Sequence, residues 1–196
     1  LTGWPVWLDS SNFSDPSARP YVLDGGWEAL IASLESGFNS GHIDFMRKDP
    51  TGRFYLRRGL QDDLTHSDRG PEPLTKLDFG LAMLRTGEAI AVGRAFAQAM
   101  SCDPDNTTLE FSFRWTGLKG RTLSSWANPA RHLSVERQAM QNVVTSRVSM
   151  PLLSAPETIA EQTHAIVSRL FVLFDGFQIH LSVVDDLVTR LLERRL

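Results

Sequence analysis

The segment from Leu109 to Trp115 constrains the fold most, because its residues alternate strictly between apolar and polar side chains. The four apolar positions are Leu109, Phe111, Phe113 and Trp115. A period of two predicts a strand with one face in the core and the other in water. Gly117 and Gly120 then predict a hairpin turn, from which residues 121–126 return as the partner strand. The chain therefore needs a core that covers one face of a sheet.

Other segments predict further strands and several helices. Residues rich in β-formers at 53–57 and 143–150 predict two more strands, the first directly after a turn at 49–52. The longest predicted helix covers 77–100, and its many small residues indicate close packing on a sheet or a partner helix. Further helices are predicted at 27–34 with Asp24 as N-cap, for one or two turns at 42–48, from Pro156 to Gly176, and at 182–192.

These elements define the predicted fold class as α+β. We expect an antiparallel sheet of about four to five strands, with helices packed mainly on one face and two helices at the C-terminal end. Residues 1–196 are predicted to form a single domain. Residues 1–23 contain three prolines and the anchors Trp4, Trp7 and Phe13, which predict an extended arm packed on that domain. The polar stretch 61–73 predicts a mobile loop.

Composition narrows the class of protein. The formal net charge is −3 at pH 7, with 20 Lys and Arg against 23 Asp and Glu, which disfavours nucleic acid as a partner of this chain. No uncharged apolar run is long enough to cross a bilayer, so no membrane partner is expected. Cys102, the only cysteine, cannot form an internal disulfide and indicates a reducing compartment, the cytoplasm. Because the chain begins with Leu1 and has no initiator methionine, it is expected to be a fragment of a longer protein.

The usual signatures of catalysis and of metal binding are missing. The sequence has no Walker A, GxGxxG, GxSxG, HExxH or CxxC pattern, so no catalytic residue, metal ligand or cofactor is predicted. Asp62, Asp63, His66 and Asp68 could form a cation site in a loop, although a solvated polar loop is the favoured interpretation. His164 is expected to be a hydrogen-bonded core histidine, and Cys102 has no cationic neighbour in sequence that would activate a thiolate.

A group of arginines gives the one specific prediction of a site. Five arginines are involved: Arg53, Arg57 and Arg58 around the predicted strand at 53–57, and Arg114 and Arg121 around the predicted hairpin. If those strands share a sheet, the guanidinium groups could converge on one polar face and bind a phosphate or carboxylate. The favoured alternative is that acidic residues neutralise them in structural ion pairs, with Glu88, Glu110, Asp62 and Asp63 as the expected partners.

Four stretches resemble a known bacterial domain: Gly3–Trp7, Asp44–Asp63, Arg85–Ile90 and Arg114–Leu123. The domain is the one found C-terminal to a Schlafen-type, Alba-like module to which ATP or DNA binding is attributed. The resemblance implies that this chain follows such a module in a protein described as a transcriptional regulator or ATP-binding protein. Met46 and Leu60 depart from the aromatic residues expected there. No functional residue carries over, because ATP or DNA binding belongs to the absent N-terminal module.

Two main classes of function remain open on the sequence. A weaker third one is direct DNA contact through the arginine strand, which the overall acidity disfavours and which would weaken steeply with added salt. The first is a non-catalytic sensory or assembly domain of a bacterial cytoplasmic regulator, which would bind a small anionic ligand or form a homodimer and signal to its N-terminal module. An apolar stripe at residues 184, 187, 188, 191 and 192 suits a partner helix or this chain's own core. The second is a hydrolase or nuclease acting on a phosphate-containing substrate, with Asp62, Asp63, His66 and the arginines as working groups.

Overall fold

The computed structural model describes residues 19–33, 42–65, 70–128, 130–131, 133–193 and 195. The chain divides into two compact units, the first ending at Gly70 and the second running from Pro71 to Leu196, and each is described by itself. The single domain expected from the sequence stays a prediction. Trp4, Trp7 and Phe13, the anchors of the predicted N-terminal arm, lie outside the described residues.

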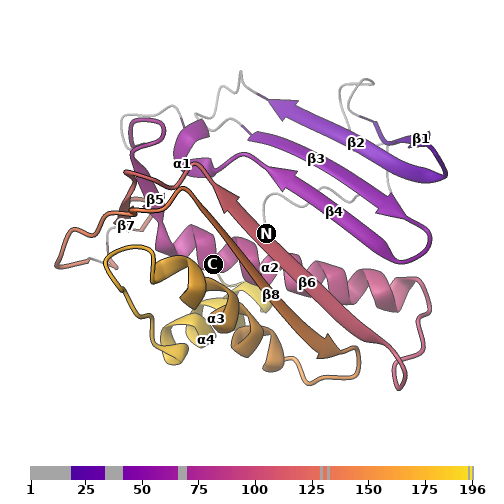
Figure 1. The fold of residues 1–196 in the computed structure, drawn as a ribbon. Helices are drawn as coiled ribbons and strands as arrows, with labels where there is room; N and C mark the ends of the chain where they lie inside the picture. The colour runs from indigo at the N-terminus through magenta and orange to yellow at the C-terminus, as the bar shows by residue number, and fades with distance from the viewer. Residues whose placement is uncertain are drawn as a thin grey trace. The chain divides into compact units, whose positions relative to one another are not determined.

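The first unit contains a four-stranded antiparallel sheet in the order β1-β2-β3-β4 (Figure 1). Its strands are β1 (Tyr21–Leu23), β2 (Gly26–Ser33), β3 (His42–Asp49) and β4 (Arg53–Arg58), followed by the short helix α1 (Gln61–Leu64). Asp24 and Gly25 join β1 to β2 with φ of 49° and 75°, the left-handed geometry of a tight hairpin. The predicted turn at 49–52 joins β3 to β4, and Gly52 takes its left-handed position at φ 91°. The predicted strand at 53–57 is confirmed.

Two helices predicted in this unit are wrong. Residues 27–34 were expected to be helical because their apolar side chains recur at helical spacing, but Gly26–Ser33 is a strand paired on both sides. Residues 42–48 likewise belong to β3. Short apolar segments fit both periods, and here pairing with distant segments decided between them. Asp24 lies in the hairpin turn rather than at a helix N-cap, and part of the predicted loop at 61–73 is the helix α1.

The described residues of the second unit form three helices and two small sheets (Figure 1). Its helices are α2 (Phe79–Ala99), α3 (Thr158–Phe171) and α4 (Leu181–Leu192). Strands β6 (Thr108–Thr116) and β8 (Val143–Pro151) form an antiparallel ribbon, and the three-residue strands β5 (Lys76–Asp78) and β7 (Thr122–Ser124) pair in parallel. The helices pack together on one face of the β6–β8 ribbon, through α3 against β8 and α2 against β6. The α+β class and the two C-terminal helices are therefore confirmed.

The predicted hairpin between residues 109–115 and 121–126 is wrong. Strand β6 pairs with β8, and β7 pairs in parallel with β5. Gly117 and Gly120 both have left-handed φ and turn the chain as expected. However, Leu118 is fully buried between them, so the turn enters the core instead of leading into a neighbouring strand.

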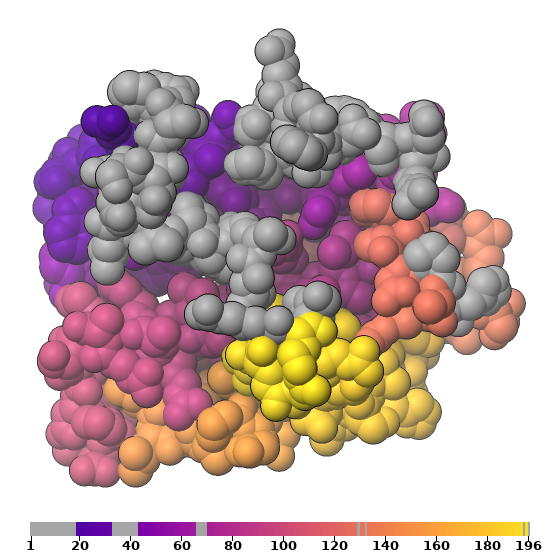
Figure 2. Space-filling view, turned by 180° about the vertical axis from the view of Figure 1, so that it is seen from behind, coloured from indigo at the N-terminus to yellow at the C-terminus, as the bar shows by residue number. Residues whose placement is uncertain are grey.

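Close packing of α2 is confirmed at two of its glycines. A Cβ atom at Gly87 would lie 3.1 Å from Val188 of α4, and one at Gly93 would lie 2.6 Å from the Phe111 ring of β6. A side chain at Gly93 would overlap the Phe111 ring, whereas one at Gly87 would only press on Val188. The apolar stripe of α4 also packs inward, since Val184, Leu187, Val188 and Leu191 are buried. Figure 2 shows α4, in yellow, with its other side at the surface of the unit.

Candidate functional site

The open sheet face is one side of the four-stranded sheet in the first unit. Alternation along the strands and the register between them place one set of side chains on this face. Its members are Tyr21, Glu28, Leu30, Ala32, Ile43, Phe45, Arg47, Asp49, Arg53, Tyr55 and Arg57. The opposite face contains Ala29, Asp44, Met46 and Lys48, which are buried. Most side chains of the open sheet face are exposed or half-buried, with Glu28 as a buried exception, whereas the described side chains of the other face are buried or half-buried except for Val22 and Trp27 near the β1 edge.

Large apolar side chains on the open sheet face are exposed. The exposed fractions are 53% for Tyr55, 49% for Leu30, 47% for Tyr21 and 36% for Ile43. Phe45 is half-buried, and its ring meets that of Tyr55 edge to face with centroids 6.2 Å apart. Grouped apolar side chains are unusual on a solvated surface and are typical of a contact site.

Two of the three arginines on this face have acidic neighbours. Arg47 forms an ion pair with Glu28, whose other oxygen accepts a hydrogen bond of 3.0 Å from the Tyr21 hydroxyl. That hydrogen bond to Glu28 raises the pKa of Tyr21. Arg53 lies opposite Asp49 in the register, and hydrogen bonds from Thr51 lower the pKa of Asp49. These two ends of the face are therefore close to neutral.

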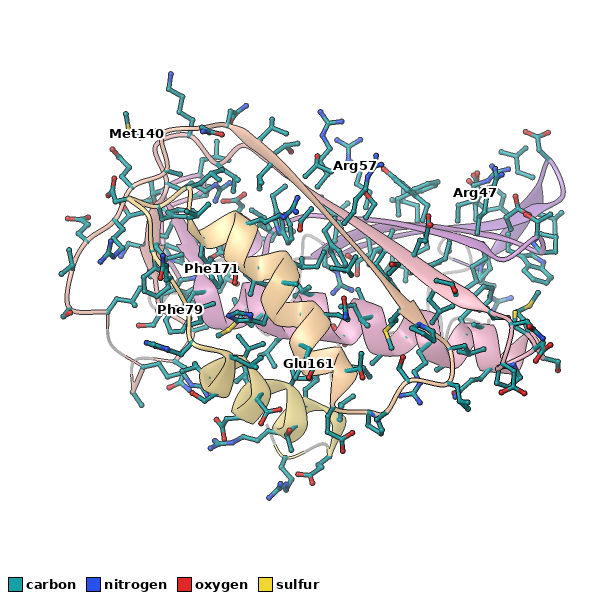
Figure 3. The ribbon with its side chains drawn as sticks, turned by 60° about the horizontal axis from the view of Figure 1, so that its bottom comes forward. Arg47, Arg57, Phe79, Met140, Glu161 and Phe171 are labelled. Carbon is teal, nitrogen blue, oxygen red and sulfur yellow. The ribbon has the colours of Figure 1, made fainter. Side chains whose placement is uncertain are left out.

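Arg57 differs from these two arginines. It lies in one cross-strand row with Leu30 and Phe45, and its side chain is exposed. No ion pair of Arg57 occurs among the described residues. Arg47 and Arg57 extend from the same side of the sheet (Figure 3). An open guanidinium beside an exposed apolar surface can bind a carboxylate or phosphate through two parallel hydrogen bonds.

The structure brings together only two of the five arginines predicted as an anion site. Arg53 and Arg57 share the open sheet face. Arg58, the next residue, lies on the opposite face, where its Nε and Nη2 donate to the two carboxylate oxygens of Asp44 at 2.7 and 2.9 Å. Arg114 and Arg121 belong to the second unit, so the shared sheet on which the prediction depended does not form.

Arg121 has a structural position. It is 1% exposed, and its guanidinium donates to the carbonyl oxygens of Gly117 at 2.6 Å and Lys76 at 2.8 Å. These bonds tie the turn at 117–120 to β5. A guanidinium held in this way is not available to a ligand from solvent.

Arg114 lies on the exposed face of the β6–β8 ribbon. Arg147 is its diagonal neighbour there, next to the hydroxyl-bearing Ser112 and Thr145. The ribbon side chains on that face are polar except for Val143 and Pro151 at its two ends, and none is aromatic. Arg114 therefore provides a matched control for Arg57, since both are exposed arginines on strands but in different surroundings.

The ion pairs that form in the described part of the chain differ from those expected. Asp44 and Glu28 neutralise Arg58 and Arg47. Glu88, expected to neutralise a site arginine, pairs with Arg85 one helical turn away at 2.8 Å. The general idea of structural pairing is thus correct for Arg58, although its partner was not among those predicted.

The described residues do not bring together a catalytic site for the predicted hydrolase or nuclease. Asp62 is buried in α1 beside Asp63, but His66 and Asp68 lie outside the described residues. Where the chain is described, no three His, Cys, Asp or Glu side chains gather so as to hold a metal ion. The hydrolase or nuclease stays a prediction.

Two further expectations concern single residues. His164 has its Nε2 at 2.9 Å from the carbonyl oxygen of Ile179, so the expected hydrogen bond is confirmed, although the ring is half-buried rather than in the core. Cys102 is a free, half-buried thiol. Within the described ranges, no helix is long and apolar enough to cross a bilayer.

Sequence reasoning missed the aromatic part of the open sheet face. Tyr21 and Phe45 come to this face through pairing in β1 and β3, which were not predicted as strands. The pattern Arg53-x-Tyr55-x-Arg57 in the predicted strand could have indicated an aromatic between two arginines on one side.

Comparison with known proteins adds no relative. No family model matches the chain, and no curated protein and no solved structure is significantly similar to it. The resemblance to the domain that follows a Schlafen-type module therefore stays a prediction.

Proposed function

We propose that this chain is a non-catalytic sensory domain whose open sheet face binds an anionic ligand. In this proposal it acts within a larger bacterial regulator in the cytoplasm and passes its ligand state to an N-terminal module. The context of a regulator comes from the resemblance of residues 3–7, 44–63, 85–90 and 114–123. The binding role is supported by the geometry of the first unit.

The position of Arg57 carries the proposal. Its exposed guanidinium lies in one row with Leu30 and Phe45 and has no ion pair among the described residues. The apolar neighbours would exclude water on one side of a bound anion, which strengthens a hydrogen-bonded charge pair. Phe45 and Tyr55 would contact the flat or apolar part of the same ligand.

Assembly through α4 is less favoured as the main function. Four of the five residues in the stripe that could have served a partner helix are buried against this chain's own helices, and only Leu192 at its end is exposed. Light scattering tests for a homodimer formed through another surface, independently of ligand binding. A chain that stays monomeric at high concentration excludes such a dimer.

The test is a thermal-shift screen with inorganic phosphate, nucleotides, phosphosugars and small dicarboxylates. A ligand at a hundredfold its dissociation constant adds about 2.7 kcal/mol of stability. That gain raises the melting temperature by about 5–11 °C for a chain of this size. We expect Arg57→Ala to abolish the shift and Arg114→Ala to retain it.

Two results would overturn the proposal. The first is the absence of a shift with every anion in the screen. The second is a shift that persists in Arg57→Ala and disappears in Arg114→Ala, which would place the ligand on the β6–β8 ribbon.

A further inference from the structure

We infer that the ligand of the open sheet face is a single-stranded nucleic acid, with bases stacked on the exposed aromatic rings and phosphates bound by arginines. This inference rests on the proposed function, because it names the chemical class of the anion. It also differs from the expectation from net charge, which disfavours nucleic acid.

Aromatic side chains on the open sheet face come from three of the four strands. Tyr21 is on β1, Phe45 on β3 and Tyr55 on β4. Tyr55 and Tyr21 are about half exposed, at 53% and 47%, so the flat surface of a base can reach them. A four-stranded antiparallel sheet with aromatic rings on its open face is an arrangement that binds unpaired bases by stacking. Stacking needs no specific base, because every base has a flat π surface.

Two arginines flank the most exposed ring on the same strand. Arg53, Tyr55 and Arg57 occupy alternate positions of β4 and therefore the same face. The Cα atoms of two residues four apart on a strand are separated by about 13 Å. A ligand lying along β4 can thus place one phosphate near each arginine and a base on the ring between them.

The shape of the surface favours a polymer over a free nucleotide. Sites for small molecules are usually concave and enclose most of the ligand. The open sheet face is the side of a sheet, with Leu30, Ile43 and Tyr55 all at least one third exposed, so it contacts a ligand from one side. A polymer makes up for the small contact area of each nucleotide on such a surface, because it repeats the same contact along its length.

The charges favour a single strand over a duplex. Duplex binding depends on many phosphate contacts from a basic surface. Here Glu28 neutralises Arg47, and Asp49 lies opposite Arg53, which leaves a small positive excess centred on Arg57. The overall charge of −3 disfavours duplex binding, which depends on phosphate contacts. Binding of a single strand by base stacking is still possible, because stacking does not depend on net charge.

The experiment measures fluorescence anisotropy of a labelled oligothymidylate of about twelve residues, within the usual site sizes for one module. An oligouridylate of the same length and a hairpin duplex are run in parallel. We expect the whole chain to bind both single strands and to bind the duplex more weakly. With two phosphate contacts, the logarithm of affinity should fall against the logarithm of salt with a slope of about −1.4.

Variants separate stacking from charge. Tyr55→Ala should weaken binding roughly fivefold to 150-fold, whereas Tyr55→Phe should retain it. Arg57→Ala should make the salt slope shallower by about 0.7, and Arg114→Ala should leave it unchanged. Tyr55 and Arg57 are exposed, so equal melting temperatures of all variants provide the check on folding.

The outcomes distinguish this inference from the proposed function. If neither single strand binds, but a small anion still stabilises the chain through Arg57, the inference is wrong and the proposed function stands. If neither oligonucleotide nor small anion binds, both are wrong. If Tyr55→Ala disrupts a homodimer seen by light scattering and no oligonucleotide binds, the face joins two copies and the inference is again wrong.

Discussion

Replacing Arg121 by alanine should destabilise the second unit strongly, although the residue was predicted from sequence to bind a ligand. Its guanidinium is 1% exposed and donates to the carbonyl oxygens of Gly117 and Lys76. Hydrogen bonds from charged donors contribute about 1.5–3 kcal/mol each, so the loss of these two costs about 3–6 kcal/mol. The melting temperature should fall by at least about 6 °C.

Urea unfolding followed by circular dichroism at helical wavelengths is a suitable assay. Helices α2, α3 and α4 all belong to the second unit, whereas α1, the described helix of the first unit, has four residues. The helical signal therefore reports mainly on the unit that contains Arg121. Arg121→Lys should give an intermediate loss, because one ammonium group does not reproduce the fork of a guanidinium.

Arg114→Ala is the matched control. Arg114 is an exposed arginine of the same unit, and its substitution should change the free energy of unfolding by less than about 0.5 kcal/mol. A loss below about 1 kcal/mol in Arg121→Ala would refute the structural role. A loss of anion binding in that variant without loss of stability would restore the original prediction of a ligand site.

Two other substitutions test the packing of α2 and the burial of a charge. Gly93→Ala gains about 1 kcal/mol of helix propensity, but the new methyl group overlaps the Phe111 ring and costs about 1–3 kcal/mol. Thermal unfolding should therefore show a net loss of stability in Gly93→Ala and a gain when the same substitution is made in a Phe111→Leu background. A gain in stability with Phe111 present would contradict this. Burial lowers the pKa of Lys48 from 10.5 to about 8. Between these values the unfolded chain binds more protons than the folded chain, so stability should rise with pH across this window. Urea midpoints near pH 7 and about pH 9.5 should show a rise that is smaller in Lys48→Met, and parallel profiles would refute this.

Sequence patterns correctly predicted the elements in which the local preference of the residues matches the way the element packs in the fold. The alternation at 109–115 predicted β6 because one face of that strand is half-buried against the helices and the other is exposed, and the apolar spacing at 77–100 predicted α2. Turn-forming residues at 49–52 and the pair Gly117 and Gly120 also predicted the turns found there. In each case the signal lies within a few residues of the element that it predicts.

The failures arose where distant segments decide the structure. Residues 26–33 include the helix formers Glu28, Ala29 and Leu30, yet they form a strand because β1 and β3 pair with both edges. The parallel pairing of β5 with β7 joins residues about 46 positions apart, and no short pattern announces it. The same limit applies to the candidate site: Arg53, Tyr55 and Arg57 lie on one predicted strand, but Tyr21 and Phe45 join them only through the register between strands.

The role of each arginine in the first unit depends on that register. Arg57 and Arg58 are neighbours of the same type, and they differ only in the face of the sheet to which they point. A shift of β4 by one residue against β3 would exchange their positions. The two hydrogen bonds between Arg58 and Asp44 oppose such a shift, because it would break a half-buried ion pair. The ion pair that removes Arg58 from the candidate site thus helps to keep Arg57 in it, beside Leu30 and Phe45.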